Sequence, residues 1–193
     1  MPRRHRPFSS DYVIDLPVVG SPPIRSRDGA ITYVKTVVER ETLATKSHLE
    51  LVAFRSGKPQ CLTSGPHDTT PHWAPDGKTL AFLRRNGEEA TPQLWLLPMN
   101  GGEPTNLSAL PGGVSEYIWS PDGSSIYAVA DVEPDAPSDS TPHVREVTEL
   151  YYRGDTIGWI GRRRRQIFSV RLVDGHISQL THGDYQHRTL AVS

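Results

Sequence analysis

The sequence predicts an all-β fold: an incomplete β-propeller with about three four-stranded blades and the start of a fourth. First, the stretch "WAPDGKTLAFLRR", which begins at Trp73, returns almost intact as "WSPDGSSIYAVAD", which begins at Trp119. Second, Asp-Gly pairs recur at spacings of 48 and 46 residues, at Asp28-Gly29, Asp76-Gly77 and Asp122-Gly123. Third, a Leu-Thr or Leu-Ser mark follows each pair, in "QCLT", "TNLS" and "SQLT". A period in the forties with four short apolar runs is typical of a propeller blade.

The Pro-Asp-Gly triplet predicts a tight turn early in each repeat. Pro75 presets φ for the first part of the turn, and the side chain of Asp76 can accept a hydrogen bond from nearby backbone. Gly77 supplies the positive φ that other residues resist. The first repeat reads "IRSRDG" instead, a departure that should matter little for the fold. An amphipathic helix is excluded here, because the triplet would interrupt it in every repeat.

The residues after the turn predict a strand that is covered on both sides. In the second repeat, Leu80 and Phe82 point to one side of the strand, and Ala81 and Leu83 point to the other. Both sides are apolar, which is typical of a strand buried between two layers. Blades that stack face to face about an axis provide those two layers.

Four strands are predicted in each repeat. Those of the first repeat cover residues 22–25, 30–38, 48–54 and 59–63, with a long polar loop, "ERETLATKS", between the second and third. Those of the second repeat cover residues 70–74, 79–85, 93–98 and 103–108, with a hairpin signal in "MNGGEP". Those of the third repeat cover residues 114–120, 125–132, 166–173 and 176–181, with a hairpin at Asp174-Gly175.

The expected organisation is an N-terminal leader over residues 1–21 and a partial propeller domain over residues 22–193. Its parts are blade one (22–63), blade two (70–108), blade three (114–181) and the start of blade four (182–193). In the leader, "SSDYVIDL" suggests a short helix with Ser9 or Ser10 as its N-cap.

Blade three carries an insertion over residues 131–165. Its first half, "DVEPDAPSDSTP", is acidic and proline-rich, and we expect a loop there. Its second half predicts an extra hairpin with apolar residues to pack, namely Val147, Leu150, Tyr152, Ile157 and Trp159.

The last residues repeat the approach to another turn. Ser193 lies 73 residues after Ser120, the residue before Pro121, and the last two Leu-Thr/Ser marks are separated by the same 73 residues. We therefore expect "SPDG" to continue beyond Ser193, and the chain to be a truncated piece of a longer propeller.

The composition indicates a globular protein and argues against two classes of partner. Hydrophobic residues make up 36% and charged residues 22%, and the net charge is −1. We therefore expect neither nucleic acid nor a membrane surface as a partner. Cys61 is the single cysteine, so no intrachain disulfide can form. The basic start is not followed by an apolar signal segment, and we expect a cytoplasmic protein.

The whole chain resembles the start of the prolyl oligopeptidase family, especially its acylaminoacyl-peptidase-like and dipeptidyl-aminopeptidase-like members. The resemblance rests on the leader "PFSSDYVIDLPVVGSPPIRSRDGAITYV", on "GPHDTTPHWAPDGKTLAFLRR", and on the insertion "LYYRGDTIGWIGRRRRQIF". The "SPDG" repeat is less specific, because TolB-like propellers share it.

The resemblance implies an N-terminal propeller and a C-terminal α/β-hydrolase domain with a Ser–Asp–His triad, the serine lying in G-x-S-x-G. The propeller would restrict access, so that mainly short peptides reach that serine. This chain has no G-x-S-x-G; "GGVSEYI" comes nearest, with Ser115 in a predicted strand. We therefore predict no catalytic residue, cofactor or metal ligand in this chain, and its substrate-binding residues and oligomeric state stay open.

Two functions from different classes follow. The first is the portion of a serine peptidase that gates and selects short peptides for a hydrolase domain, its partner in the parent chain. The second is a TolB-like interaction module with no enzyme attached. The leader and the insertion favour the peptidase.

Two His/Asp groups could be metal sites: His67, Asp68 and His72, and then His182, Asp184 and His187. Ordinary residues at the ends of strands are the favoured interpretation, because no specific ligand spacing accompanies either group.

Other motifs also have a plainer interpretation. Arg162–Arg165 could be a nucleic-acid patch, but a solvated hairpin edge with alternating sides is favoured. The Arg153-Gly154-Asp155 tripeptide is interpreted as a coincidence. Trp73 and Trp119 recur at one repeat position, which favours blade packing over a ligand platform. Glu88-Glu89 lies in a polar loop and is given no role in binding a peptide's amino group.

Overall fold

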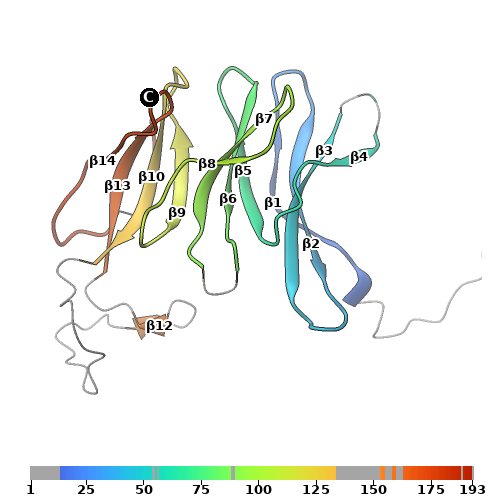
Figure 1. Cartoon of the computed structure of the whole chain (residues 1–193), viewed down its shortest axis with the longest axis horizontal. Helices are drawn as coiled ribbons and strands as arrows, with labels where there is room; N and C mark the ends of the chain where they lie inside the picture. Colours follow the sequence, from blue (N-terminus) through green and yellow to red (C-terminus); the bar gives the residue numbers. More distant parts are fainter. Residues whose placement is uncertain are drawn as a thin grey trace, which may run out of the picture. The chain divides into compact units, whose positions relative to one another are not determined.

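The computed structural model describes residues 14–53, 55, 57–87, 90–133, 153–154, 158–159, 163–187 and 189–192. The described residues form strands that assemble into three four-stranded antiparallel sheets and one two-stranded sheet (Figure 1). They divide into two compact units, unit 1 (Met1–Leu107) and unit 2 (Ser108–Ser193). The predicted all-β fold with four-stranded blades is confirmed.

Unit 1 contains two of the four-stranded sheets, and in both the strand order follows the chain, as in a blade. The first sheet consists of β1 (Val18–Arg25), β2 (Ile31–Val38), β3 (Thr45–Val52) and β4 (Pro59–Cys61). The second consists of β5 (Asp68–Trp73), β6 (Thr79–Arg84), β7 (Gln93–Pro98) and β8 (Thr105–Asn106).

Unit 2 contains the third sheet, formed by β9 (Val114–Trp119), β10 (Ser125–Val132), β13 (Arg164–Arg171) and β14 (Ile177–Gln179). The insertion lies between β10 and β13, and within it β11 (Arg153–Gly154) pairs with β12 (Gly158–Trp159). This pair is the predicted extra hairpin, although most of the insertion, including Val147, Leu150, Tyr152 and Ile157, lies outside the described residues. The described residues of 182–193 form no strand, so the start of a fourth blade stays a prediction.

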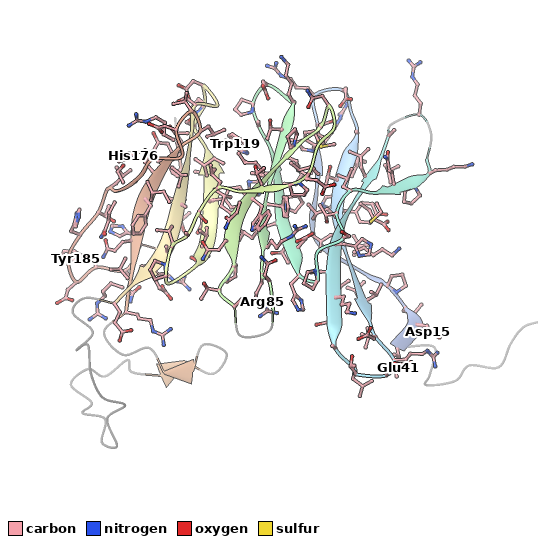
Figure 2. The ribbon with its side chains drawn as sticks, in the orientation of Figure 1. Asp15, Glu41, Arg85, Trp119, His176 and Tyr185 are labelled. Carbon is pink, nitrogen blue, oxygen red and sulfur yellow. The ribbon has the colours of Figure 1, made fainter. Side chains whose placement is uncertain are left out.

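The start of the chain is described only from residue 14 onward. Ser9 and Ser10 therefore lie outside the described residues, and of the predicted short helix only Ile14 and Asp15 are described as helical. Arg40 Nε donates to Asp15 Oδ1 at 2.6 Å, which joins this segment to the loop between β2 and β3. Figure 2 labels Asp15 beside Glu41 of that loop.

The Asp-Gly turn has the same geometry in all three repeats. In each, the glycine N–H donates to the carbonyl three residues earlier: Gly29 to Ser26 at 3.2 Å, Gly77 to Ala74 at 2.9 Å and Gly123 to Ser120 at 2.9 Å. The three glycines have φ values of 89°, 73° and 71°. The aspartate caps the turn as predicted, since Asp76 Oδ1 accepts the Lys78 N–H at 2.9 Å. The missing proline of "IRSRDG" therefore does not change the turn.

The Leu-Thr/Ser mark fastens the short fourth strand to the third. The leucine N–H donates to a third-strand carbonyl in every sheet: Leu62 to Leu49 at 2.8 Å, Leu107 to Leu94 at 2.8 Å and Leu180 to Ile167 at 2.7 Å. The threonine hydroxyl then accepts the N–H of that same third-strand residue, at 3.0 Å for Thr63 and Leu49 and at 2.8 Å for Thr181 and Ile167. The hydroxyl thus continues the ladder after the strand ends, which explains why the pair recurs.

The core of unit 1 lies between its two sheets. Val34 and Leu49 of the first sheet pack with Leu80, Phe82 and Leu97 of the second, and Trp73 and Trp95 lie against them. The prediction that both sides of β6 are covered is confirmed, because Leu80, Ala81 and Phe82 are fully buried and Leu83 is only 4% exposed. Each such large side chain contributes about 1.5–3 kcal/mol by leaving water.

The opposite face of the first sheet carries a polar cluster that the sequence analysis did not predict. Glu50, 7% exposed, accepts hydrogen bonds from the Tyr33 hydroxyl, from Lys35 Nζ at 2.8 Å and from His48 Nε2 at 3.4 Å. The hydrogen bond to Glu50, together with burial, raises the pKa of Tyr33 to about 12. Tyr33 and Lys35 lie opposite Glu50 and His48 in the β2–β3 ladder, so the four side chains share one face.

Two of the three third strands begin earlier in the structure than the sequence predicts. The third strand of the first repeat was expected at residue 48, but β3 begins at Thr45, because Val38 pairs with Thr45 and shortens the loop. The third strand of blade three was expected at residue 166, but β13 begins at Arg164, which pairs with Val132. Both starts were missed because the first residues of these strands are polar or charged and do not look like part of an apolar strand.

Candidate functional site

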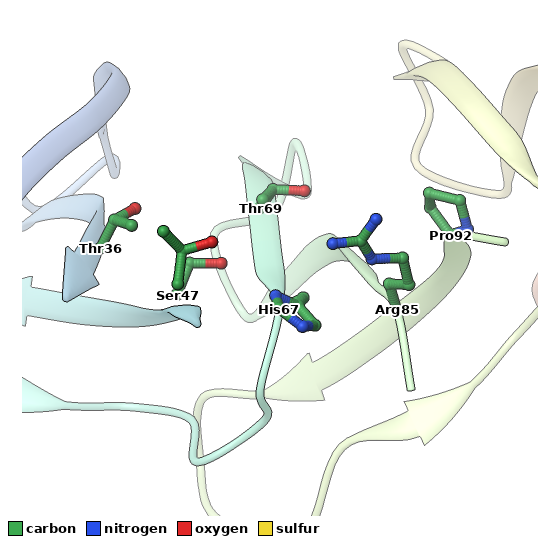
Figure 3. Close-up of a pocket in the computed structure, with 7 residues that line it drawn as sticks. Thr36, Ser47, His67, Thr69, Arg85 and Pro92 are labelled. Carbon is green, nitrogen blue, oxygen red and sulfur yellow. The ribbon is translucent and has the colours of Figure 1, made fainter. Parts of the chain in front are cut away.

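The strand ends of unit 1 surround a polar cavity of about 320 Å³. It lies where β2 ends, β3 and β5 begin and β6 ends, at the side of the sheets opposite the Asp-Gly turns; we call this side the loop end. Figure 3 shows side chains from several of these strand ends around one hollow. The lining side chains are those of Thr36, Thr45, Ser47, His67, Thr69, Arg85 and Pro92.

Backbone hydrogen bonds hold the walls of this cavity in place. The Ser47 N–H donates to Pro66 O at 2.9 Å, which attaches β3 to the connection between the two sheets. The Arg85 N–H donates to His67 O at 3.1 Å, so the end of β6 is fixed beside the residue that precedes β5. The positions of Arg85 and His67 are therefore set by the sheets themselves.

A buried ion pair lies next to the cavity. Arg84 binds Asp68 with both arms of its guanidinium, Nε to Oδ1 at 2.6 Å and Nη2 to Oδ2 at 2.9 Å. Asp68 is fully buried, and the guanidinium of Arg84 also lies over the rings of Phe82 and Trp95, at 5.1 and 4.8 Å from their centroids. The arrangement is typical of a structural ion pair, in which both charges are neutralised and their polar atoms are bonded.

Gly65 makes room for this ion pair. A Cβ atom at Gly65 would lie 2.5 Å from Arg84 Nε and 2.5 Å from Asp68 Oδ1, closer than non-bonded atoms approach. A side chain at this position would therefore displace one of the two charged groups. The requirement for glycine comes from this close approach.

The other end of the same two sheets, the turn end, has a different character. A cavity of about 590 Å³ there is lined by apolar side chains that include Leu51, Trp73 and Met99, and also by charged and polar residues of the turns, among them Asp76 and Lys78. Trp73 packs against the core cluster, and Trp119 of unit 2 is only 7% exposed. Both tryptophans therefore have the packed surroundings that the sequence predicts, and Trp73 also borders the cavity at the turn end.

The first predicted His/Asp group does not converge on one point. Asp68 is committed to Arg84, whereas His67 lines the polar cavity. His72 lies within β5, and its burial lowers its pKa. In the part of the chain that the structure describes, no group of three or more His, Cys, Asp or Glu side chains is placed to hold a metal ion.

The second group is also divided among different contacts. Asp184 Oδ1 lies 3.4 Å from Arg164 Nε, and the His187 backbone N–H donates to Arg165 O at 3.2 Å. His182 and Asp184 line a separate cavity of about 400 Å³ in unit 2, with Arg164 and Gln166.

The arginine run needs a partial correction. Arg164 and Arg165 point to alternate sides as predicted, but Arg164 is only 8% exposed, so its expected solvation is wrong. The cause is the extension of β13 by two residues, which pairs Arg164 with Val132. Arg165 Nε lies 3.8 Å from Asp131 Oδ1, whereas Arg162 lies outside the described residues.

The other motifs are placed as follows. Ser115 lies in β9 as predicted, and its hydroxyl donates to Val129 O at 3.2 Å. Arg153 and Gly154 form β11, while Asp155 and the Glu88-Glu89 pair lie outside the described residues. None of the helical residues described is part of a segment long and apolar enough to cross a membrane.

The sequence analysis missed Arg85 and the hydroxyl groups around it. Arg84-Arg85 was visible only as the end of an apolar strand, and the hydroxyls come from three separate strands. One signal was available: strand alternation places two consecutive arginines on opposite sides, so that only one of them can occupy a given buried site.

Comparisons with known proteins point to peptidases. No protein-family model matches the chain. The chain is 31% identical over 192 residues to "Uncharacterized peptidase YuxL" of Bacillus subtilis, an alignment that covers 92% of this chain and 29% of that protein. The chain thus spans less than a third of the length of this curated relative.

Solved structures show the same fold. Pyrococcus horikoshii acylaminoacyl peptidase superposes with a TM-score of 0.70 and 17% identity, over 86% of this chain and 25% of that one. A putative TolB from Agrobacterium tumefaciens superposes with a TM-score of 0.56 and 22% identity, over 87% of this chain and 48% of that one. The expected resemblance to acylaminoacyl-peptidase-like and TolB-like propellers is confirmed.

Proposed function

We propose that this chain is the propeller portion of a peptidase, and that it admits short peptides to, and selects them for, a hydrolase domain elsewhere in the parent protein. The similarity to the Bacillus subtilis peptidase supports the proposal most directly, because it extends over 92% of this chain but only 29% of that protein. The remaining length of the relative is sufficient for a further domain.

The chemistry of the chain agrees with a role in selection. Acyl transfer requires a nucleophile, a base and an oxyanion hole held together, and the sequence contains no G-x-S-x-G. The serine of its nearest match, Ser115, is the second residue of β9, and its hydroxyl donates to a carbonyl of the neighbouring strand. The polar cavity at the loop end is a hollow in which part of a peptide could be held.

The test compares two proteins made from the same gene: the 193-residue chain and the full-length product of the native reading frame. Both are assayed with acyl-amino-acid and dipeptidyl chromogenic substrates, with heat-killed protein as the control. We expect turnover only by the full-length protein, abolished by a serine-directed inhibitor. Turnover by the 193-residue chain, or none by the full-length protein, would contradict the proposal.

A second candidate is a TolB-like interaction module with no enzyme attached. The superposition on the Agrobacterium tumefaciens TolB supports it, because this chain covers 48% of that structure. A native reading frame that lacks G-x-S-x-G and a full-length protein without hydrolase activity would favour this candidate.

Two further elements belong to the proposal. We place the start of a fourth blade at residues 182–193, on the strength of the repeat spacing that ends at Ser193. We also place the protein in the cytoplasm, which the single free cysteine, Cys61, favours. Sequencing beyond Ser193 and cell fractionation test these two elements.

A further inference from the structure

Two neighbouring arginines at the end of β6 have different surroundings. The guanidinium of Arg84 forms the buried ion pair with Asp68 and lies over two aromatic rings. Arg85 is half-buried and lines the polar cavity, and in the described part of the chain no carboxylate lines that cavity with it. Among the residues that the structure describes, Arg85 thus brings a positive charge to a cavity whose lining holds no carboxylate.

The side chains around Arg85 are suited to an anion. Thr36, Ser47 and Thr69 bring hydroxyl groups to the cavity, and His67 brings a ring N–H. In Figure 3 the guanidinium of Arg85 extends into the space beside Thr69 and His67. A guanidinium with several neutral donors is a typical setting for a carboxylate, which accepts bonds at two oxygens.

Two carboxylates near the cavity, Asp68 and Glu39, are already paired with other groups. Asp68 is held by Arg84, and Glu39, in the adjoining β2–β3 loop, is held by Lys46 Nζ at 2.8 Å and by the Thr42 hydroxyl at 2.8 Å. The hydrogen bonds from Lys46 and Thr42 lower the pKa of Glu39, so it stays ionised and paired. Neither of these two carboxylates is therefore free to bind Arg85.

We propose that the cavity at the loop end of unit 1 binds a carboxylate group of a short peptide through Arg85, with the surrounding hydroxyls and His67 as additional donors. The carboxylate is either the C-terminus of the peptide or an acidic side chain. The inference rests on the proposed function, since it names a chemical feature of the peptides that the propeller would select. The cavity volume of about 320 Å³ accommodates a carboxylate and one or two residues.

The test is a calorimetric titration of the full-length protein with three small peptides. N-acetyl-Ala-Ala carries a free C-terminal carboxylate, N-acetyl-Ala-Ala-amide carries none, and N-acetyl-Asp-Ala-amide carries only a side-chain carboxylate. We expect at least one carboxylate peptide to bind about tenfold or more tightly than the uncharged amide. Whichever carboxylate peptide binds more tightly identifies the source of the group.

Three variants connect the binding to Arg85. Arg85→Gln removes the charge. We expect it to lower the affinity for the carboxylate peptide about tenfold or more and to leave the affinity for the uncharged amide unchanged. Arg85→Lys retains a charge without the planar fork, so it should retain part of the affinity. Lys78→Gln, which removes an exposed cation at the turn end, should change nothing. Thermal melts check that each variant is folded.

The result that overturns the inference is equal affinity for the acid and amide peptides, or equal affinity of the wild type and Arg85→Gln. The titrated protein is first inactivated with the serine-directed inhibitor, so the heat reports binding and not hydrolysis. A protein that binds carboxylates through Arg85 but cleaves no substrate would uphold this inference and defeat the proposed peptidase. A protein that cleaves the substrates but binds the acid and amide peptides equally well would uphold the proposed peptidase and overturn this inference.

Discussion

The two ends of unit 1 are built from the same two sheets, yet they differ in chemistry. At the turn end, the Asp-Gly turns repeat the same local hydrogen bonds, and the adjacent hollow combines large apolar side chains such as Leu51, Trp73 and Met99 with the polar residues of the turns. At the loop end, hydroxyls, an imidazole and a guanidinium line the hollow, and a buried ion pair lies beside it. The polar groups of the loop end come from strands far apart in the sequence.

The difference indicates a division of tasks between the ends. The turn end is formed by hydrogen bonds between residues close in the sequence, and each repeat contains them. Its geometry is therefore the same even where "IRSRDG" replaces the usual triplet. The loop end is free of that constraint, because no repeated motif fixes its side chains. Non-repeated residues there can acquire binding roles without damage to the blade.

The largest loss of stability is expected when the ion pair at the loop end is broken. Asp68→Ala leaves the buried guanidinium of Arg84 without its partner and should lower the free energy of unfolding by about 3–5 kcal/mol. Chemical denaturation followed by tryptophan fluorescence measures the change. The matched control replaces both groups, Asp68→Leu with Arg84→Met, and should be less destabilised than the single variant. A single variant within about 1 kcal/mol of wild type would mean that the pair is not structural.

The next prediction concerns the polar face of the first sheet, which belongs to neither end. Burial alone would raise the pKa of Glu50, but hydrogen bonds from Lys35, Tyr33 and His48 outweigh it and lower the pKa. The folded chain thus keeps the carboxylate ionised at a lower pH than the unfolded chain does. Its contribution to stability is present above the ordinary value of 4.5 and is lost as pH falls below it.

Glu50→Gln removes this contribution. At neutral pH it should cost about 1.5 kcal/mol, at the low end for hydrogen bonds to a charged group because Lys35 is partly exposed. The difference in unfolding free energy between wild type and variant should shrink as the pH falls through the acid range, as measured by urea denaturation at several pH values. A difference that stays constant with pH would show that the charge of Glu50 is irrelevant.

An effect of similar size is expected from the glycine of a turn. Gly77 has a φ of 73°, and a Cβ atom there would lie an acceptable 3.7 Å from the Cβ of Arg27. Gly77→Ala should therefore cost only the backbone strain, about 1–2 kcal/mol. Gly20→Ala is the control, since a Cβ atom there meets nothing within 4 Å. If both alanine variants had equal stability, the turn would not depend on its positive φ.

The smallest effect should come from the aspartate of the same turn. Asp76→Ala removes one exposed hydrogen bond, from the Lys78 N–H at 2.9 Å. The expected cost is within about 0.5 kcal/mol, because water can replace an exposed partner. Thermal unfolding of Asp76→Ala and Gly77→Ala, measured side by side, compares the stability that each variant loses. A larger loss of stability for Asp76→Ala would contradict our account of the turn.

The sequence was sufficient for the features that repeat. The turn at Gly77, the buried strand from Thr79 and the Leu-Thr mark could all be predicted, because each depends on residues close together in the chain. The Asp68–Arg84 pair could not, since the predicted strand began at residue 70 and left Asp68 outside it. Its partner is defined only by the register that places Asp68 opposite Arg84.

The candidate site was harder to predict for the same reason. His67 was noticed as part of a metal motif, but its actual neighbour is Arg85, which the end of β6 brings beside it. The burial of Arg164 was missed because charged residues at a strand end are normally assigned to solvent. Both cases depend on which strand ends meet, and one sequence carries little information about that.

The central claim is that peptides bind at the loop end and not at the turn end. Nuclear magnetic resonance of the full-length protein, labelled with nitrogen-15 only in arginine and tryptophan, tests it directly during addition of N-acetyl-Ala-Ala. The Arg85 Nε–H signal reports the loop end, and the Trp73 Nε1–H signal reports the turn end. Our account predicts that the Arg85 signal shifts with peptide concentration while the Trp73 signal stays in place. A shift of Trp73 without a shift of Arg85 would contradict it.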